Sequence, residues 1–107
     1  MCSAKSEVRS ARFHAEAASE LQAEATYYEQ HTKGLGERFT REVEAAVRVA
    51  CLFPYMGSPY KYGTRRVYPK KFPFSVVYLV RSEEVLVLAI APFSKTPGYW
   101  RNRRRVV

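Results

Sequence analysis

The sequence predicts an α+β fold made of an N-terminal strand, an antiparallel helical hairpin and a three-stranded antiparallel β-meander. Two stretches between residues 15 and 53 repeat apolar side chains at helical spacing. Three later runs, rich in Val, Tyr and Phe, follow one another after Thr64. A chain of 107 residues has room for one hydrophobic core, so we expect one domain over residues 1–107, with a loose leader at 1–6 and a basic tail at 101–107.

The first half of the predicted fold is a strand followed by two helices. Residues 8–13 can form the strand, and residues 15–31 form the first helix, which Lys33 and Gly34 end. The second helix repeats the pattern until Phe53 and Pro54, with charged side chains on its opposite face. The short link between the helices contains Gly34 and Gly36, which makes the pair an antiparallel hairpin.

The second half is predicted to be a loop and a meander. Residues 54–63 contain two Pro, two Gly and three Tyr, which is typical of a loop. Strands are expected at residues 65–68, 74–81 and 85–91, with a tight connection at 82–84. The runs VVYLV and VLVLAIA are continuously apolar, so these two strands should lie in the middle of the sheet.

Several classes of site are excluded by what the chain lacks. It contains no aspartate, which removes Ser-His-Asp triads and most Mg²⁺ or Ca²⁺ sites. His14 and His31 lie at opposite ends of the first helix, so we expect no metal and interpret His14 as a helix cap. Cys2 and Cys51 are interpreted as reduced thiols, with Cys51 in the core. We also expect no cofactor. We expect no membrane span and a cytoplasmic protein, because no long apolar run or signal peptide is present.

The positive charge is concentrated in the second half of the chain. Lys and Arg number 18 against 10 acidic residues, and only Glu83 and Glu84 fall after residue 53. This half would therefore attract an acidic partner, such as nucleic acid or an acidic protein segment.

The basic and aromatic residues at the two ends of the meander are the candidate site. We expect the two groups to converge, and Arg and Lys interleaved with Tyr and Trp suit phosphate contacts and base stacking. Since side chains alternate along a strand, only one of two neighbouring arginines can join a given groove. The alternative is that these charges are solvated surface that keeps the protein soluble. The binding candidates are Lys61, Arg66, Lys70, Lys71, Trp100 and Arg101.

A nuclease without metal would need a base, an acid and a cation beside the scissile phosphate. Lys61, Arg65, Lys95 and Tyr99 are the candidates here, and no histidine falls in this region.

A set of motifs in this order resembles the RelE/ParE superfamily of toxins from bacterial type II toxin–antitoxin systems. The pieces are RFHAEAASEL, TYYEQ, GLGERFTREVEAA, GTRRV, FPFSVVYLV, VLVLAIA and PGYWRNR, which together cover nearly the whole chain. The resemblance implies the same strand, helical hairpin and meander. It also implies a cognate antitoxin as partner.

The superfamily contains two activities, and the FPF and PGYW motifs look more like its ParE-like branch, which includes plasmid stabilisation proteins. ParE-like members inhibit DNA gyrase by binding, whereas RelE-like members cleave mRNA on the ribosome. Arg65 and Tyr99 match positions used by the nucleases, but Pro92 and Phe93 stand where relatives carry a histidine and arginines, and only Lys95 keeps a charge. We therefore expect a gyrase inhibitor. The alternatives are a ribosome-dependent mRNA endonuclease using Arg65, Lys95 and Tyr99, or an inactive homologue that retains only antitoxin binding.

Overall fold

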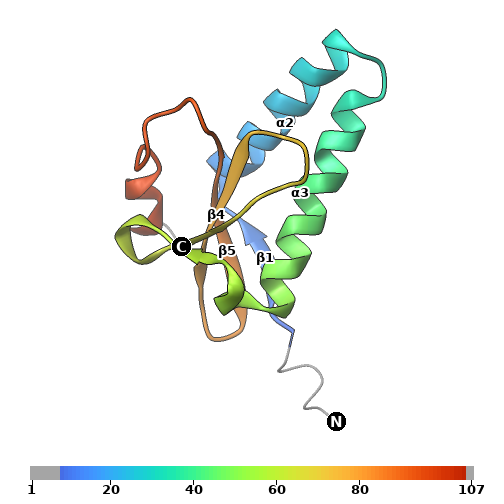
Figure 1. The fold of residues 1–107 in the computed structure, drawn as a ribbon. Coiled ribbons are helices and arrows are strands. Elements are labelled where there is room, and N and C mark those ends of the chain that lie inside the picture. The colour runs from blue at the N-terminus through green and yellow to red at the C-terminus, as the bar shows by residue number, and fades with distance from the viewer. Residues whose placement is uncertain (1–7, 106–107) are drawn as a thin grey trace.

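A five-stranded sheet separates a helical hairpin from the C-terminal segment (Figure 1). The structure, a computed structural model, describes residues 8–105. The predicted leader, residues 1–6, lies outside the described residues, as do the last two residues of the predicted tail. The elements are β1 (Ser10–Phe13), α2 (Ala15–His31), α3 (Leu35–Leu52), η1 (Pro54–Met56), β2 (Ser58–Pro59), η2 (Lys61–Gly63), β3 (Arg65–Val67), β4 (Phe74–Val80), β5 (Glu84–Pro92) and η3 (Arg101–Arg105).

The two helices begin with different caps. His14 is the N-cap of α2, as predicted, and its Nδ1 accepts a hydrogen bond from the backbone N–H of Glu16 at 3.1 Å. The N-cap of α3 is Gly34, which has no side chain and adopts a φ of 86°. The carboxylate of Glu29 replaces it, accepting from Gly34 N at 2.8 Å and Gly36 N at 2.9 Å. The link between the helices is thus closed by a side chain of the first one.

Gly36 allows the helices to cross closely at the start of α3. A Cβ atom at this position would collide with the backbone carbonyl oxygen of Ala25 on α2. Gly36, in the link between the helices, therefore has a packing role.

The sheet has the order β1-β5-β4-β3-β2, and β3, β4 and β5 form the predicted antiparallel meander. The α+β class and its elements are confirmed. β1 lies beside β5 in parallel, pairing Ser10 with Glu84 and Phe13 with Val87. Residues 54–63, expected to be a loop, also contain two 3₁₀ turns and the two-residue strand β2, which pairs with Arg65 and Arg66.

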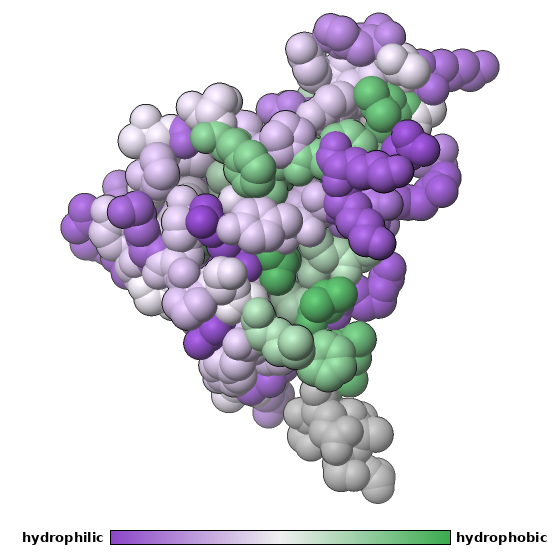
Figure 2. Space-filling view, in the orientation of Figure 1, coloured by the Kyte–Doolittle hydropathy of each residue, from purple (hydrophilic) through white to green (hydrophobic). Residues whose placement is uncertain are grey.

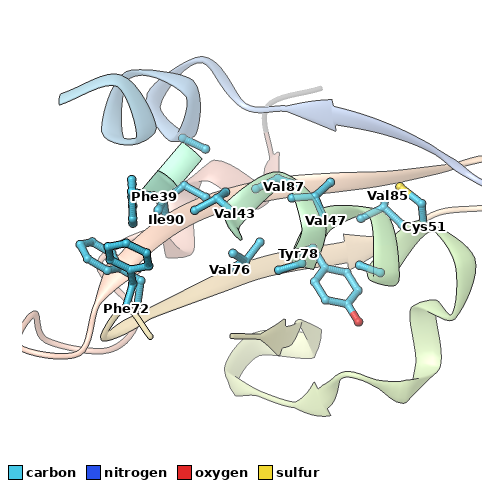
Figure 3. Close-up of a cluster of buried hydrophobic side chains, with 14 residues drawn as sticks. Phe39, Val43, Val47, Cys51, Phe72, Val76, Tyr78, Val85, Val87 and Ile90 are labelled. Carbon is cyan, nitrogen blue, oxygen red and sulfur yellow. The ribbon is translucent and has the colours of Figure 1, made fainter. Parts of the chain in front are cut away.

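Two hydrophobic clusters lie on the two faces of the sheet. The larger one joins the helices to the sheet and contains Phe39, Val76 and the buried Cys51, as expected of that thiol (Figure 3). The smaller one, on the other face, is built around Trp100. A register shift in β4–β5 leaves Leu88 without a partner, because Val77 pairs with Ala89 and the next residue pairs with Val87. Side chains of the continuously apolar strand β5 point to both faces of the sheet, so this strand supplies both clusters.

Candidate functional site

Arg65 and Arg66 point to opposite faces of β3, as the alternation of a strand requires. Arg65 lies on the side of η1, where its Nη1 donates to the backbone carbonyls of Tyr55 at 3.0 Å and Gly57 at 2.7 Å. Its guanidinium also lies 5.3 Å from the centre of the Tyr55 ring. Arg65 therefore fastens η1 to the sheet.

Arg66 lies on the face of the Trp100 cluster, close to two tyrosine rings. Its guanidinium carbon is 4.0 Å from the centre of the Tyr60 ring and 5.4 Å from that of Tyr68. Arginine stacks well on aromatic faces, because its delocalised charge meets the negative face of the ring. Among the two neighbouring arginines, Arg66 is the one that joins the predicted groove.

The stacking continues from Arg66 toward the C-terminal segment. The rings of Tyr60 and Trp100 are 5.7 Å apart, and those of Trp100 and Tyr62 are 5.9 Å apart. Arg101 lies 4.9 Å from the Tyr62 ring and Arg104 5.4 Å from it. Trp100, predicted as a binding residue, is fully buried and cannot touch a partner directly. It packs against the Tyr60 and Tyr62 rings instead, and the arginines lie beside these tyrosines.

A pocket of about 330 Å³ opens beside Arg66; we call it the Arg66 pocket. Lys95 brings a second positive charge, with its Nζ 4.6 Å from the centre of the Tyr99 ring. Among residues 8–105, no carboxylate lines the pocket. Its walls are Tyr60, Arg66, Tyr68, Ser75, Ala91, Pro92, Phe93, Lys95, Thr96, Pro97, Tyr99 and Trp100.

Tyr99 is tied into a network with α2. Its hydroxyl donates to Oε2 of Glu20 at 2.9 Å, and Arg103 donates to the same oxygen at 2.9 Å. Burial, followed by the Glu20 charge, raises the pKa of Tyr99 far above its ordinary value of 10.0. A phenol with a raised pKa releases its proton less readily, and this proton is already donated to Glu20.

The network formed by Glu20, Tyr99 and Arg103, here called the Glu20 network, completes the edge of β5. β1 pairs with β5 only as far as Val87, so the next backbone groups on that edge have no neighbouring strand. Arg103 donates to the carbonyl of Leu88 at 2.9 Å, and Oε1 of Glu20 accepts from the N–H of Ile90 at 3.0 Å. Two side chains thus satisfy buried backbone groups where a strand would.

The remaining candidates lie apart from the Arg66 pocket. Lys70 and Lys71 line a separate hollow with Arg38 and Glu42 of α3. Lys61 is exposed at the start of η2. The two basic groups expected to converge meet in part: Arg66 and Lys95 line one pocket, and Arg101 and Arg104 lie at Tyr62, the residue that follows Lys61.

The described part of the chain offers no metal centre or membrane-spanning helix. Between residues 8 and 105 no three His, Cys or acidic side chains gather as a metal site would require. Within the same range no helix is long and apolar enough to cross a bilayer.

Comparison with known proteins identifies the family. Residues 11–96 match the family described as the ParE toxin of type II toxin–antitoxin systems, parDE. The chain belongs to the ParE toxin family. A solved structure, the chromosomal ParDE TA system from P. aeruginosa, is similar in fold to this ParE-family chain, with a TM-score of 0.69 and 22% identity over 81% of this chain and 98% of that one. A search of curated proteins finds no match. The family implies an antitoxin partner.

Several residues of this ParE-family site were not predicted from the sequence. Tyr60 and Tyr62 carry the stacking, and Glu20 and Arg103 hold the C-terminal segment. The three tyrosines of residues 54–63 were a signal for the first pair, since aromatic side chains are unusual in a solvated loop. Glu20 gave no such signal, because its spacing matches that of a solvated helix face.

Proposed function

We propose that this ParE-family toxin inhibits DNA gyrase by binding it, without cleaving a nucleic acid. The supporting observation concerns two of the three residues that a metal-independent ribonuclease would use, because both already form hydrogen bonds within the chain. Arg65 donates to two backbone carbonyls near η1, and Tyr99 donates to Glu20. Arg65 lies on the η1 side of β3 and does not line the pocket that Lys95 and Tyr99 line, and Tyr99 cannot release its proton without giving up its bond to Glu20. Lys95 alone cannot serve as base, acid and phosphate clamp.

The proposal includes a cognate antitoxin that neutralises the toxin in the cytoplasm. An exposed apolar patch covers the C-terminal end of α3 and η1, and Figure 2 shows it as the green area toward the lower right. Phe53 is 54% and Met56 78% exposed there. A hollow of about 300 Å³ runs from this patch to Arg66. An amphipathic segment with acidic residues would cover both the apolar and the basic surface.

Supercoiling by purified gyrase tests the target. We expect added toxin to inhibit supercoiling and expression without antitoxin to slow growth. Normal supercoiling at saturating toxin contradicts the gyrase proposal. Arg101→Gln removes an exposed charge from the proposed binding surface and should weaken inhibition, whereas Arg48→Gln removes the same charge from the exposed face of α3 and should not.

Two further measurements separate the alternatives. Primer extension on translated mRNA would reveal codon-phased cuts if the protein were a ribosome-dependent nuclease; their absence agrees with the proposal. Harmless expression combined with tight antitoxin binding would instead identify an inactive homologue.

A further inference from the structure

Arg66 differs from Arg65 and Arg103 in its hydrogen bonding. Arg65 bonds two backbone carbonyls, and Arg103 bonds a backbone carbonyl and the Glu20 carboxylate. Arg66 takes part in none of the ion pairs found among residues 8–105. Its Nε is buried and has no hydrogen-bond partner in this range. A buried donor without an acceptor is costly, so its retention in a pocket points to a ligand.

The stacking of Arg66 determines which groups it can bind. The centres of the Tyr60 and Tyr68 rings lie 4.0 Å and 5.4 Å from the guanidinium carbon. The N–H donors of a guanidinium lie in its own plane, where they form a fork that matches the two oxygens of a carboxylate. Within the described part of the chain the pocket has no carboxylate on its walls, and Lys95 is one of its lining residues. The positive charges of Arg66 and Lys95 therefore favour binding of an anion in the pocket.

The rim of the pocket favours a protein side chain over a nucleic acid. Tyr68 and Phe93 meet edge to face at 5.9 Å, and they are 46% and 58% exposed. They offer an apolar surface to the residue next to an acid. A nucleic acid strand would need a row of cations for successive phosphates. Arg101 and Arg104 of η3 lie at Tyr62 instead, and no arginine of η3 lines this pocket within residues 8–105.

We propose that the Arg66 pocket binds the carboxylate of a Glu or Asp side chain from an acidic protein segment, whose neighbouring apolar residue packs on Tyr68 and Phe93. The volume of about 330 Å³ accommodates such a pair of side chains. This inference goes beyond gyrase inhibition, because it assigns a ligand chemistry to one site and holds whichever partner supplies the acid.

Nuclear magnetic resonance on the ¹⁵N-labelled full chain, made by cell-free synthesis, tests the proposal. The buried Nε–H of Arg66 should exchange slowly with water and give its own signal. The probes are the blocked peptide acetyl-Ala-Glu-Phe-Ala-amide, the same peptide with Gln in place of Glu, and the trinucleotide UUU. We expect the Glu peptide to shift this signal and the amides of Ser75 and Lys95 with an apparent Kd of about 1–10 mM.

Variants make the result specific to the pocket. Arg66→Gln should weaken the Glu peptide about tenfold or more, as read from the Ser75 and Lys95 amides. Arg48→Gln removes a charge on α3, outside the pocket, and should leave the affinity unchanged. Retained amide dispersion in Arg66→Gln establishes that the variant is folded. Equal binding of the Gln peptide, no saturable shift with the Glu peptide, or tighter binding of UUU at these signals overturns the proposal. Each readout is independent of supercoiling, so the gyrase proposal can fail separately.

Discussion

Replacing Arg103 with Met tests whether the Glu20 network holds the C-terminal segment on the sheet. Met preserves much of the volume of the aliphatic stem and removes all the donors. The side chain of Arg103 is 11% exposed and that of Glu20 20%, so water screens their interaction weakly. Arg103→Met should therefore destabilise the folded protein, and its effect should not resemble that of an ordinary surface arginine.

The size of the effect follows from the bonds that Arg103 makes. It donates to Glu20 at 2.9 Å and to the Leu88 carbonyl at 2.9 Å, and its contact with the mostly exposed Glu16 adds little. A hydrogen bond to a charged group contributes about 1.5–3 kcal/mol. Since Glu20 keeps its bonds from Tyr99 and Ile90, the loss should total about 2–4 kcal/mol. For a domain of this size that lowers the melting temperature by roughly 10–25 °C.

Urea unfolding followed by circular dichroism measures this loss. Arg105→Met is the matched control, because Arg105 is exposed in the same short helix and should change the free energy of unfolding by less than about 0.5 kcal/mol. A double-mutant cycle with Glu20→Gln should give a coupling of about 1–3 kcal/mol. If Arg103→Met unfolds at the same urea concentration as Arg105→Met, the network does not stabilise the fold and the reasoning is refuted.

Three further variants test other parts of the molecule. Tyr99→Phe should cost about 1 kcal/mol in urea unfolding and leave growth inhibition intact; a folded variant that no longer inhibits growth would show that the hydroxyl is used in function. Gly36→Ala should destabilise by about 1–2 kcal/mol although Ala favours helices, because its Cβ meets the Ala25 carbonyl; a stabilised variant would mean that the hairpin opens freely. Glu29→Gln tests pH dependence. The hydrogen bond that Glu29 accepts from the N–H of Gly34 lowers the pKa of Glu29 below its ordinary value of 4.5 in the folded state. The contribution of Glu29 to stability is therefore present above pH 4.5 and is lost as the pH falls through the folded-state pKa. The variant should be less stable at neutral pH and lose less on acidification; identical urea midpoints from neutral pH down to about pH 3 would contradict this assignment.

The elements of the fold could be predicted because their signals are local. Helical spacing of apolar residues and a Gly-containing link define the hairpin, and α2 begins and ends where the sequence indicates. The partner of β1 could not be predicted, since its pairing with β5 joins segments more than seventy residues apart. The strand β2 is two residues long and contains Pro59, which leaves no periodicity to detect.

The choice between Arg65 and Arg66 was within reach of the sequence. The two residues were expected on opposite faces, and Val67 shares a face with Arg65. Because Val67 packs against the helix-side cluster, Arg65 must lie on the same side as η1 and Arg66 must face the pocket. The apolar residue Val67, two positions after Arg65, thus indicates that Arg65 has a structural role. The family motif alone would instead point to Arg65 as the functional residue.

The lengths of two strands explain why Glu20 and Arg103 are needed. β5 has nine residues and β1 four, so β5 must satisfy the backbone groups that extend past its shorter neighbour. The Glu20 network does this, which removes Arg103 from the surface available to a partner. Arg101 and Arg104 remain at Tyr62, and Arg66 remains in its pocket. A loss of toxicity in a tail variant is therefore informative about binding only for arginines other than Arg103, since losing Arg103 would also lower the stability of the fold.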